Sequence, residues 1–134
     1  MKTKFIISCI IYIFPLPEFI RAQSILERID SINSIPYVDI VSNLIKHKYL
    51  FEDNLQLARN INYNEGITRA YSKLALIEYL LAKYDVSINH HIEAIKIFDS
   101  LKIYEDLSDE YGELGYQLKR QNLQKAFYYM GIGI

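Results

Sequence analysis

The sequence predicts an all-α protein built from antiparallel helix pairs, and three observations indicate this class. Apolar residues recur at helical spacing, as in the stripe from Tyr84 to Phe98 with steps of 4, 3, 4 and 3 residues. A shift of forty residues aligns matching apolar positions without a gap, with Tyr71 on Tyr111 and Leu74 on Leu114. No stretch alternates between apolar and polar residues for long enough to predict a strand.

Composition limits the size of the domain and the class of partner. The 134 residues are 51% hydrophobic, which is enough for one small packed domain. The formal net charge is −1 and no basic run occurs, so nothing favours binding of nucleic acid by this chain. The single cysteine, Cys9, excludes a disulfide within the chain and a cysteine-based metal cage.

Residues 1–22 have the layout of a secretory signal peptide. Lys2 and Lys4 precede an uncharged run that ends at Phe14, and Ala22 offers a small residue before a cut. The run is shorter than the roughly 20 apolar residues that span a bilayer, so cleavage is favoured over a retained anchor. Export to the periplasm or another extracytoplasmic space is therefore expected.

Residues 23–50 predict N-terminal helices, interrupted at Ser34-Ile35-Pro36 because the residue before a proline disfavours helix. These helices form either a cap on the repeats or a degenerate first repeat. The forty-residue match fades before about residue 51, which favours the cap.

Residues 51–134 carry the repeats, the last of them incomplete. The turn inside the first full pair is expected at Lys83-Tyr84-Asp85, with Asp85 capping the second helix. Small residues let helix axes approach to about 8–10 Å, and bulky neighbours fill the space beside each crossing. The residues expected to carry this packing are Tyr71, Leu74, Ala75, Tyr84, Ser87, Ala94, Tyr111, Leu114, Gly115 and Ala126.

This pattern resembles the tetratricopeptide repeat (TPR) family over about residues 40–134. The resemblance implies a right-handed α-solenoid of helix pairs. The chain departs from the family in having Tyr71 where a tryptophan is usual, no closing proline, and a period of about forty instead of about 34. The stretches NYNEGITRAYSKLALIEY and LSDEYGELGYQLKR are similar to exported sensor regions of Bacteroidetes-type signalling proteins.

The resemblance implies a protein–protein interaction scaffold that binds a peptide or protein segment, as the sensory part of a signalling protein. The alternative is the N-terminal portion of a larger membrane-bound sensor histidine kinase or LuxR-type DNA-binding regulator. The closing stretch AFYYMGIGI leaves an apolar helix face without a partner, which favours a fragment or self-association through that helix.

In this family the first helix of each pair lines a concave groove. The corresponding residues that point away from the packing stripe are the candidate peptide-binding residues, with ordinary solvated surface as the equal alternative. They are Arg69, Ser72, Leu76, Tyr79, Asp109, Tyr116, Lys119 and Arg120.

No pattern predicts catalysis, a metal or a cofactor. His90 and His91 are adjacent, so on a helix they point about 100° apart and cannot both reach one ion. His91 lies on the apolar stripe and is expected to be a core histidine with a satisfied ring nitrogen. The acidic stretch from Glu105 to Glu113 is expected to offset the dipole at the start of a helix. A non-enzymatic protein without cofactors is therefore expected.

Overall fold

The computed structural model describes residues 16–119 and 122–133, and within these ranges it contains helices and no strand. The all-α prediction is therefore confirmed. The expected signal peptide lies mostly outside the described residues, and the expected boundaries after residues 22 and 50 both lie inside helices. The helices are α2 Leu16–Asn33, α3 Tyr37–Ser42, α4 Leu44–Asn60, α5 Asn64–Leu80, α6 Tyr84–Leu101, α7 Tyr104–Leu118 and α8 Leu123–Gly133.

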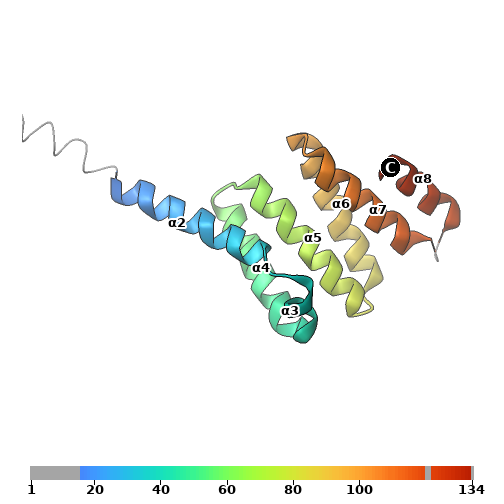
Figure 1. Cartoon of the computed structure of the whole chain (residues 1–134), viewed down its shortest axis with the longest axis horizontal. Coiled ribbons are helices and arrows are strands. Elements are labelled where there is room, and N and C mark those ends of the chain that lie inside the picture. The colour runs from blue at the N-terminus through green and yellow to red at the C-terminus, as the bar shows by residue number, and fades with distance from the viewer. Residues whose placement is uncertain (1–15, 120–121, 134) are drawn as a thin grey trace, which may run out of the picture.

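Each helix from α4 onward packs against the next one in the chain, and successive helices run in opposite directions (Figure 1). The C-terminal part of α2 packs across both α4 and α5, while its N-terminal part projects from the stack (Figure 1). Helices α5 and α7, which alternate with α4 and α6 in this series, share a side of the molecule. Phe19 and Ile20 in the projecting part of α2 are exposed.

Three turns at twenty-residue intervals join the long helices. Asn62, Ala82 and Lys102 all adopt the left-handed conformation, with φ of 54°, 60° and 58°. At each turn the N–H of this residue donates to the carbonyl three positions back, and the next N–H donates to the carbonyl five back. This is the Schellman arrangement, which here closes three helices without a glycine. Because these turns recur every twenty residues, the forty-residue period of the sequence spans two helices and two turns of the same kind.

The expected turn at residues 83–85 is wrong by two residues. The chain turns through Leu81, Ala82 and Lys83, and α6 already begins at Tyr84. Lys83 is the N-cap and makes no side-chain capping hydrogen bond, so Asp85 lies in the first helical turn instead of capping it. The reason is that backbone hydrogen bonds around Ala82 close the turn, and alanine carries no turn signal.

The segment before α4 breaks as the proline suggests, and then breaks again. Helix α2 ends at Asn33 and α3 begins at Tyr37, directly after Pro36. The expected single helix after Pro36 is divided at Asn43, whose φ of −157° is non-helical. The Asn43 side chain accepts a hydrogen bond from the Lys46 N–H at 3.0 Å and so caps α4.

The core lies between α4, α5, α6 and α7. Phe51, Phe98, Leu74 and Leu114 are among its largest buried side chains. Of the residues expected to carry the repeat packing, Tyr71, Leu74, Ala75, Ser87, Ala94, Leu114 and Gly115 are buried, and Tyr111 is partly buried. Tyr84 instead lies at the rim, 47% exposed, with its ring edge-on to Tyr79. The side chain of Ala126 is outside the described residues.

Candidate functional site

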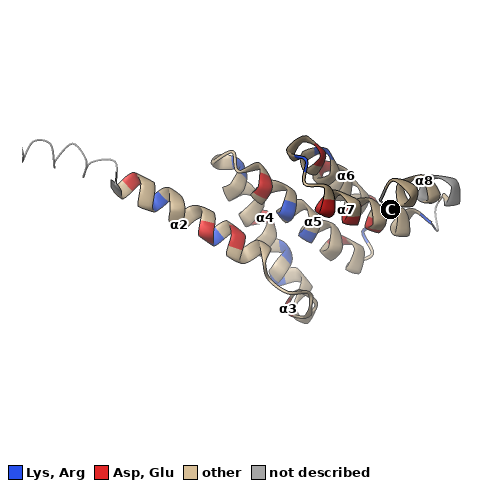
Figure 2. Cartoon of the chain, turned by 45° about the horizontal axis from the view of Figure 1, so that its top comes forward, with Lys and Arg blue, Asp and Glu red and all other residues tan. Residues whose placement is uncertain are grey.

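A polar cleft of about 470 Å³ opens on the side of the molecule that α2, α5 and α7 share. Residues at the C-terminal end of α2, on α5 and in the first half of α7 line most of the cleft, so we call α2 and α7 its walls and α5 its floor. The ribbons of these three helices, with acidic residues in red and basic residues in blue, can be followed in Figure 2. The lining residues are Asp30, Asn33, Ser34, Tyr63, Glu65, Arg69, Ser72, Lys73, Phe98, Asp106, Asp109 and Glu110.

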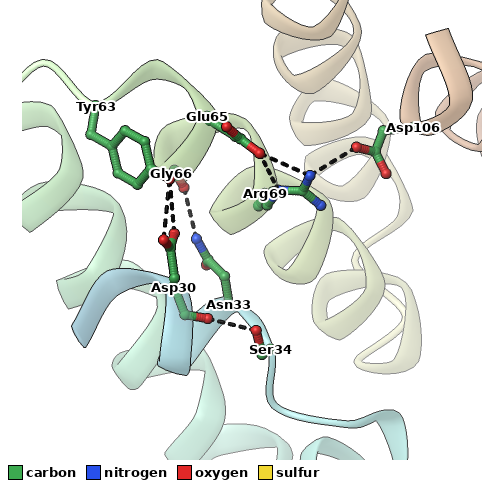
Figure 3. A network of polar contacts seen from close by, with 8 residues as sticks. All are labelled: Asp30, Asn33, Ser34, Tyr63, Glu65, Gly66, Arg69 and Asp106. Atoms are coloured by element: carbon green, nitrogen blue, oxygen red, sulfur yellow. Dashed lines mark hydrogen bonds and ion pairs between the residues drawn. The ribbon is translucent and has the colours of Figure 1, made fainter. Parts of the chain in front are cut away.

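Arg69 joins the floor of the cleft to the α7 wall. Its Nη2 lies 3.0 Å from Glu65 Oε1 and 3.1 Å from Asp106 Oδ2 (Figure 3). Burial opposes the charged form of Arg69, but the hydrogen bond to Glu65 and the charge of Asp106 outweigh it and raise the pKa of Arg69. The guanidinium therefore stays charged and bridges two helices.

Two hydrogen bonds hold the α2 wall on α5 (Figure 3). Tyr63 Oη donates to the Asp30 carboxylate, 3.0 Å from Oδ1, and Asn33 Nδ2 donates to the Gly66 carbonyl at 3.1 Å. Burial raises the pKa of Tyr63 to about 12, and the hydrogen bond to Asp30 adds to the effect. A Cβ on Gly66 would lie 2.8 Å from Ile29 Cγ2, so α2 crosses α5 at a point where only glycine fits.

Lys73 lies one turn after Arg69 and has a different environment. Its Nζ donates to the Ile35 carbonyl at 3.1 Å, and it forms no ion pair with any described residue. Burial lowers the pKa of Lys73. The hydrogen bond to Ile35 joins α5 to the segment that follows α2.

Beneath the cleft, Glu110 begins a buried chain of hydrogen bonds. One of its oxygens accepts from the Ser72 hydroxyl, and the other lies 2.6 Å from His91 Nδ1. Gln117 Nε2 lies 2.9 Å from His91 Nε2. Both contacts are satisfied when Nδ1 donates to Glu110 and Nε2 accepts from Gln117. The expectation of a core histidine is met, since His91 is 3% exposed.

The same chain continues from Gln117 to Ser87 on α6. Ser87 Oγ lies 2.9 Å from Gln117 Oε1 and donates to the Ala75 carbonyl at 2.7 Å. Three helices, α5, α6 and α7, are thus connected through polar atoms in the interior. This arrangement leaves Glu110 with two roles, since it also lines the cleft.

A second, smaller cleft of about 320 Å³ lies on α4, α5 and α6. The Arg59 guanidinium donates to the Tyr71 hydroxyl there, and the Tyr71 and His90 rings are 5.5 Å apart. Burial lowers the pKa of His90, although the charge of Glu78 opposes this. His90 and His91 therefore face different surroundings, as adjacent helical residues must.

Of the candidate groove residues, the structure brings Arg69, Ser72 and Asp109 together in the larger cleft. Leu76 and Tyr79 on α5 are partly buried and do not line it. Tyr116 is exposed, with Lys119 Nζ 4.0 Å from the centre of its ring, also outside the cleft. Arg120 is outside the described residues.

The lining residues that sequence reasoning missed come mainly from two sources. Asp30, Asn33 and Ser34 on the α2 side carry no sequence signal, because the docking of α2 depends on a distant glycine. Asp106 and Glu110 did carry a sequence signal, since they lie three residues before and one residue after the candidate Asp109. Glu110 was assigned to dipole compensation, but only Glu105 and Asp106 lie in the first turn of α7.

Other classes of site find no support in the described part of the chain. No group of three or more His, Cys, Asp or Glu residues there has the arrangement of a metal site. None of the helices within residues 16–119 and 122–133 is both long and apolar enough to cross a membrane. Comparison of the chain with models of known families, with curated proteins and with solved structures yields no match.

Proposed function

We propose that this protein is a TPR-like α-solenoid scaffold that binds a peptide segment in the cleft formed by α2, α5 and α7. The observation that carries the proposal is the cleft itself. Residues as far apart in sequence as Asp30 and Glu110 contribute polar side chains to one hollow of about 470 Å³. Supporting it, the turns at residues 62, 82 and 102 make successive helix pairs alike, as a repeated scaffold requires.

The lining favours a peptide over a small apolar ligand. Sites for small molecules are mostly apolar with a few polar groups, whereas Phe98 is the only aliphatic or purely aromatic hydrocarbon side chain among the lining residues. Hydroxyl, amide, carboxylate and amine groups make up most of the rest. Such a surface suits the backbone amides and polar side chains of a peptide.

Within this proposal the scaffold is the exported sensory part of a signalling protein. That role rests on the resemblance of residues 62–79 and 107–120 to sensor regions of such proteins. The cleft includes residues from both stretches, Arg69 in the first and Asp109 in the second.

Selection of short random peptides displayed on phage, against the folded chain, tests the binding proposal. The selected peptides are then measured on Ser34→Trp, which places a large ring in the cleft. Ser100→Trp is the matched control, because Ser34 and Ser100 are both exposed and both donate to a carbonyl of the preceding helical turn at 2.7 Å. Peptides that lose binding only to Ser34→Trp support the proposal, and peptides that bind both variants equally contradict it.

A further inference from the structure

We propose that the segment received by the cleft is basic, with a lysine or arginine side chain bound at Asp109. This inference rests on the proposed function, since it names the chemistry of the peptide that the same cleft would take. Two observations support it: the cleft has an excess of negative charge, and some of its carboxylates already have hydrogen-bond or ion-pair partners whereas Asp109 has none among the described residues.

The cleft carries more negative than positive charge. Five of its lining residues are acidic and two are basic, so their formal sum is 2 − 5 = −3. Arg69 already faces Glu65 and Asp106, and Lys73 is held against a backbone carbonyl. Two cations cannot balance five carboxylates, so the cleft keeps a net negative charge.

The helix dipole does not explain this charge. Asp106 is in the first turn of α7, where a carboxylate is stabilised, but Asp109 and Glu110 are in the second turn, where the effect has decayed. Residues three and four apart share a face of a helix, and like charges at that spacing destabilise it. Asp106 therefore repels Asp109 and Glu110 on the wall of the cleft, and a bound cation would relieve the repulsion.

Asp109 is the carboxylate that a ligand can engage without displacing anything. Asp106 is paired with Arg69, and Glu110 is bound to Ser72 and His91. Asp109 is exposed and makes no hydrogen bond or ion pair with the residues that the structure describes. A lysine or arginine of a peptide thus finds one free carboxylate there, with Asp30 lining the opposite wall.

The test uses three fluorescent peptides of equal length that share one set of uncharged residues. The first carries several Lys and Arg residues, the second the same number of Asp and Glu residues, and the third Ser at those positions. Binding to the full chain is measured by anisotropy at low salt and at about 0.15 M salt. We expect the basic peptide to bind best and to weaken as salt rises.

Two variants locate the binding. Asp109→Lys reverses the charge in the cleft, and Asp53→Lys makes the same change at an exposed residue of α4, a helix that contributes nothing to the cleft. We expect Asp109→Lys to weaken the basic peptide about tenfold and Asp53→Lys to leave it nearly unchanged. Equal weakening by both variants, or no preference for the basic peptide, would overturn the inference.

The outcomes separate this inference from the proposed function. If the acidic or the uncharged peptide binds best, and Ser34→Trp abolishes that binding, the cleft receives peptides but the basic assignment is wrong. If no peptide is affected by Ser34→Trp, the proposed function fails together with the inference.

Discussion

The α5–α6 hairpin is packed from both sides, and the two sides differ in their buried polar contacts. On one side α4 buries Phe51, Leu55 and Ala58, and its Lys48 forms an ion pair at 2.7 Å with the buried Glu78 of α5; we call this the α4 junction. On the other side α7 buries Leu107, Leu114 and Leu118 together with Glu110, and we call this the α7 junction. The α7 junction alone contains the buried hydrogen-bond chain from Ser72 to Ser87.

The adjacent histidines of α6 show the difference within one helix. His90 lies beside the Tyr71 ring and lines the small cleft with Arg59 of α4. His91 is held by Glu110 and Gln117 of α7. A buried histidine requires a hydrogen-bond partner at a specific place. The α7 junction is therefore aligned through the contacts of His91, and the α4 junction through the ion pair of Lys48 with Glu78.

The largest expected effect removes the centre of the α4 junction. Phe51 is fully buried, so Phe51→Ala should lower the free energy of unfolding by about 3–5 kcal/mol through lost burial and a residual cavity. Urea denaturation followed by circular dichroism measures this change. Tyr49→Ala is the control, since Tyr49 is an aromatic of the same helix that is 64% exposed, and its loss should change little. Similar effects of the two variants would contradict the placement of Phe51.

At the α7 junction the expected cost arises from unpaired polar atoms. Glu110→Ala removes the acceptor of both Ser72 and His91 and should destabilise by about 1–3 kcal/mol. In a cycle of Glu110→Leu and His91→Leu, the double variant should lose less than the sum of the two single losses, because the Glu110–His91 pair is removed together and only Ser72 and Gln117 lose these partners. Additive losses in this cycle would contradict the pairing. Glu113→Ala, at an exposed acidic residue of α7, is the control.

Gly66→Ala tests the crossing of α2 and α5, which belongs to neither junction. Its effect gives a reference for the losses at the two junctions. The added Cβ would lie 2.5 Å from Tyr63 Cδ1 and 2.8 Å from Ile29 Cγ2. The clash should cost about 1–3 kcal/mol, partly offset by a gain of up to about 1 kcal/mol in helix propensity. We expect a net loss in urea denaturation. Gly112→Ala is the control, because a Cβ there meets nothing within 4 Å and should stabilise α7.

Ala82→Gly should stabilise the hairpin that both junctions share. Ala82 has φ of 60°, which is strained for any residue with a Cβ and relaxed for glycine. After the larger chain entropy of glycine is subtracted, the expected gain is about 0.5–1 kcal/mol in the unfolding free energy. The same change at helical Ala75, where φ is negative, should destabilise instead. A loss of stability in Ala82→Gly would contradict the left-handed turn.

The smallest expected effect concerns the pH dependence of stability through His90. Burial lowers the pKa of His90 below its usual 6.5. Below about pH 6.5 the imidazole therefore binds a proton more readily in the unfolded chain than in the folded chain, so stability falls as pH decreases. Above this pH the imidazole causes no loss of stability. In the original chain the midpoint of urea unfolding should fall as pH decreases from about 7.5 to about 5.5, and this fall should be smaller in His90→Asn. A fall of equal size in His90→Asn would contradict the burial of His90.

Much of the fold was predictable, because apolar periodicity and the forty-residue match depend on helix geometry alone. The turn inside the first full pair was not located correctly, since Ala82 adopts a left-handed conformation that its residue type does not signal. In the site, three of the groove residues that the resemblance implies, Arg69, Ser72 and Asp109, line the cleft. Leu76, Tyr79, Tyr116 and Lys119 do not line it. The α2 wall could not be predicted, because its position depends on contacts at Gly66 that appear only after folding.

Similarly, the sequence could mark His91 as a polar residue on an apolar stripe but could not name its partner. Glu110 is 19 residues away on another helix, and several other carboxylates surround it in sequence. Only the angle at which α7 packs on α6 decides which of them reaches the imidazole. Local periodicity predicts which face is buried, whereas pairing between helices is a property of the assembled core.

The position of the cleft along α5 has a consequence for the size of any bound segment. The lining residues of α5 run from Glu65 to Lys73, whereas Leu76 and Tyr79 lie outside the cleft. At 1.5 Å per residue this stretch is about 12 Å long. An extended chain rises about 3.3 Å per residue, so a strand laid along it would be covered over about four residues. The cleft thus sets a short recognition length within any longer peptide.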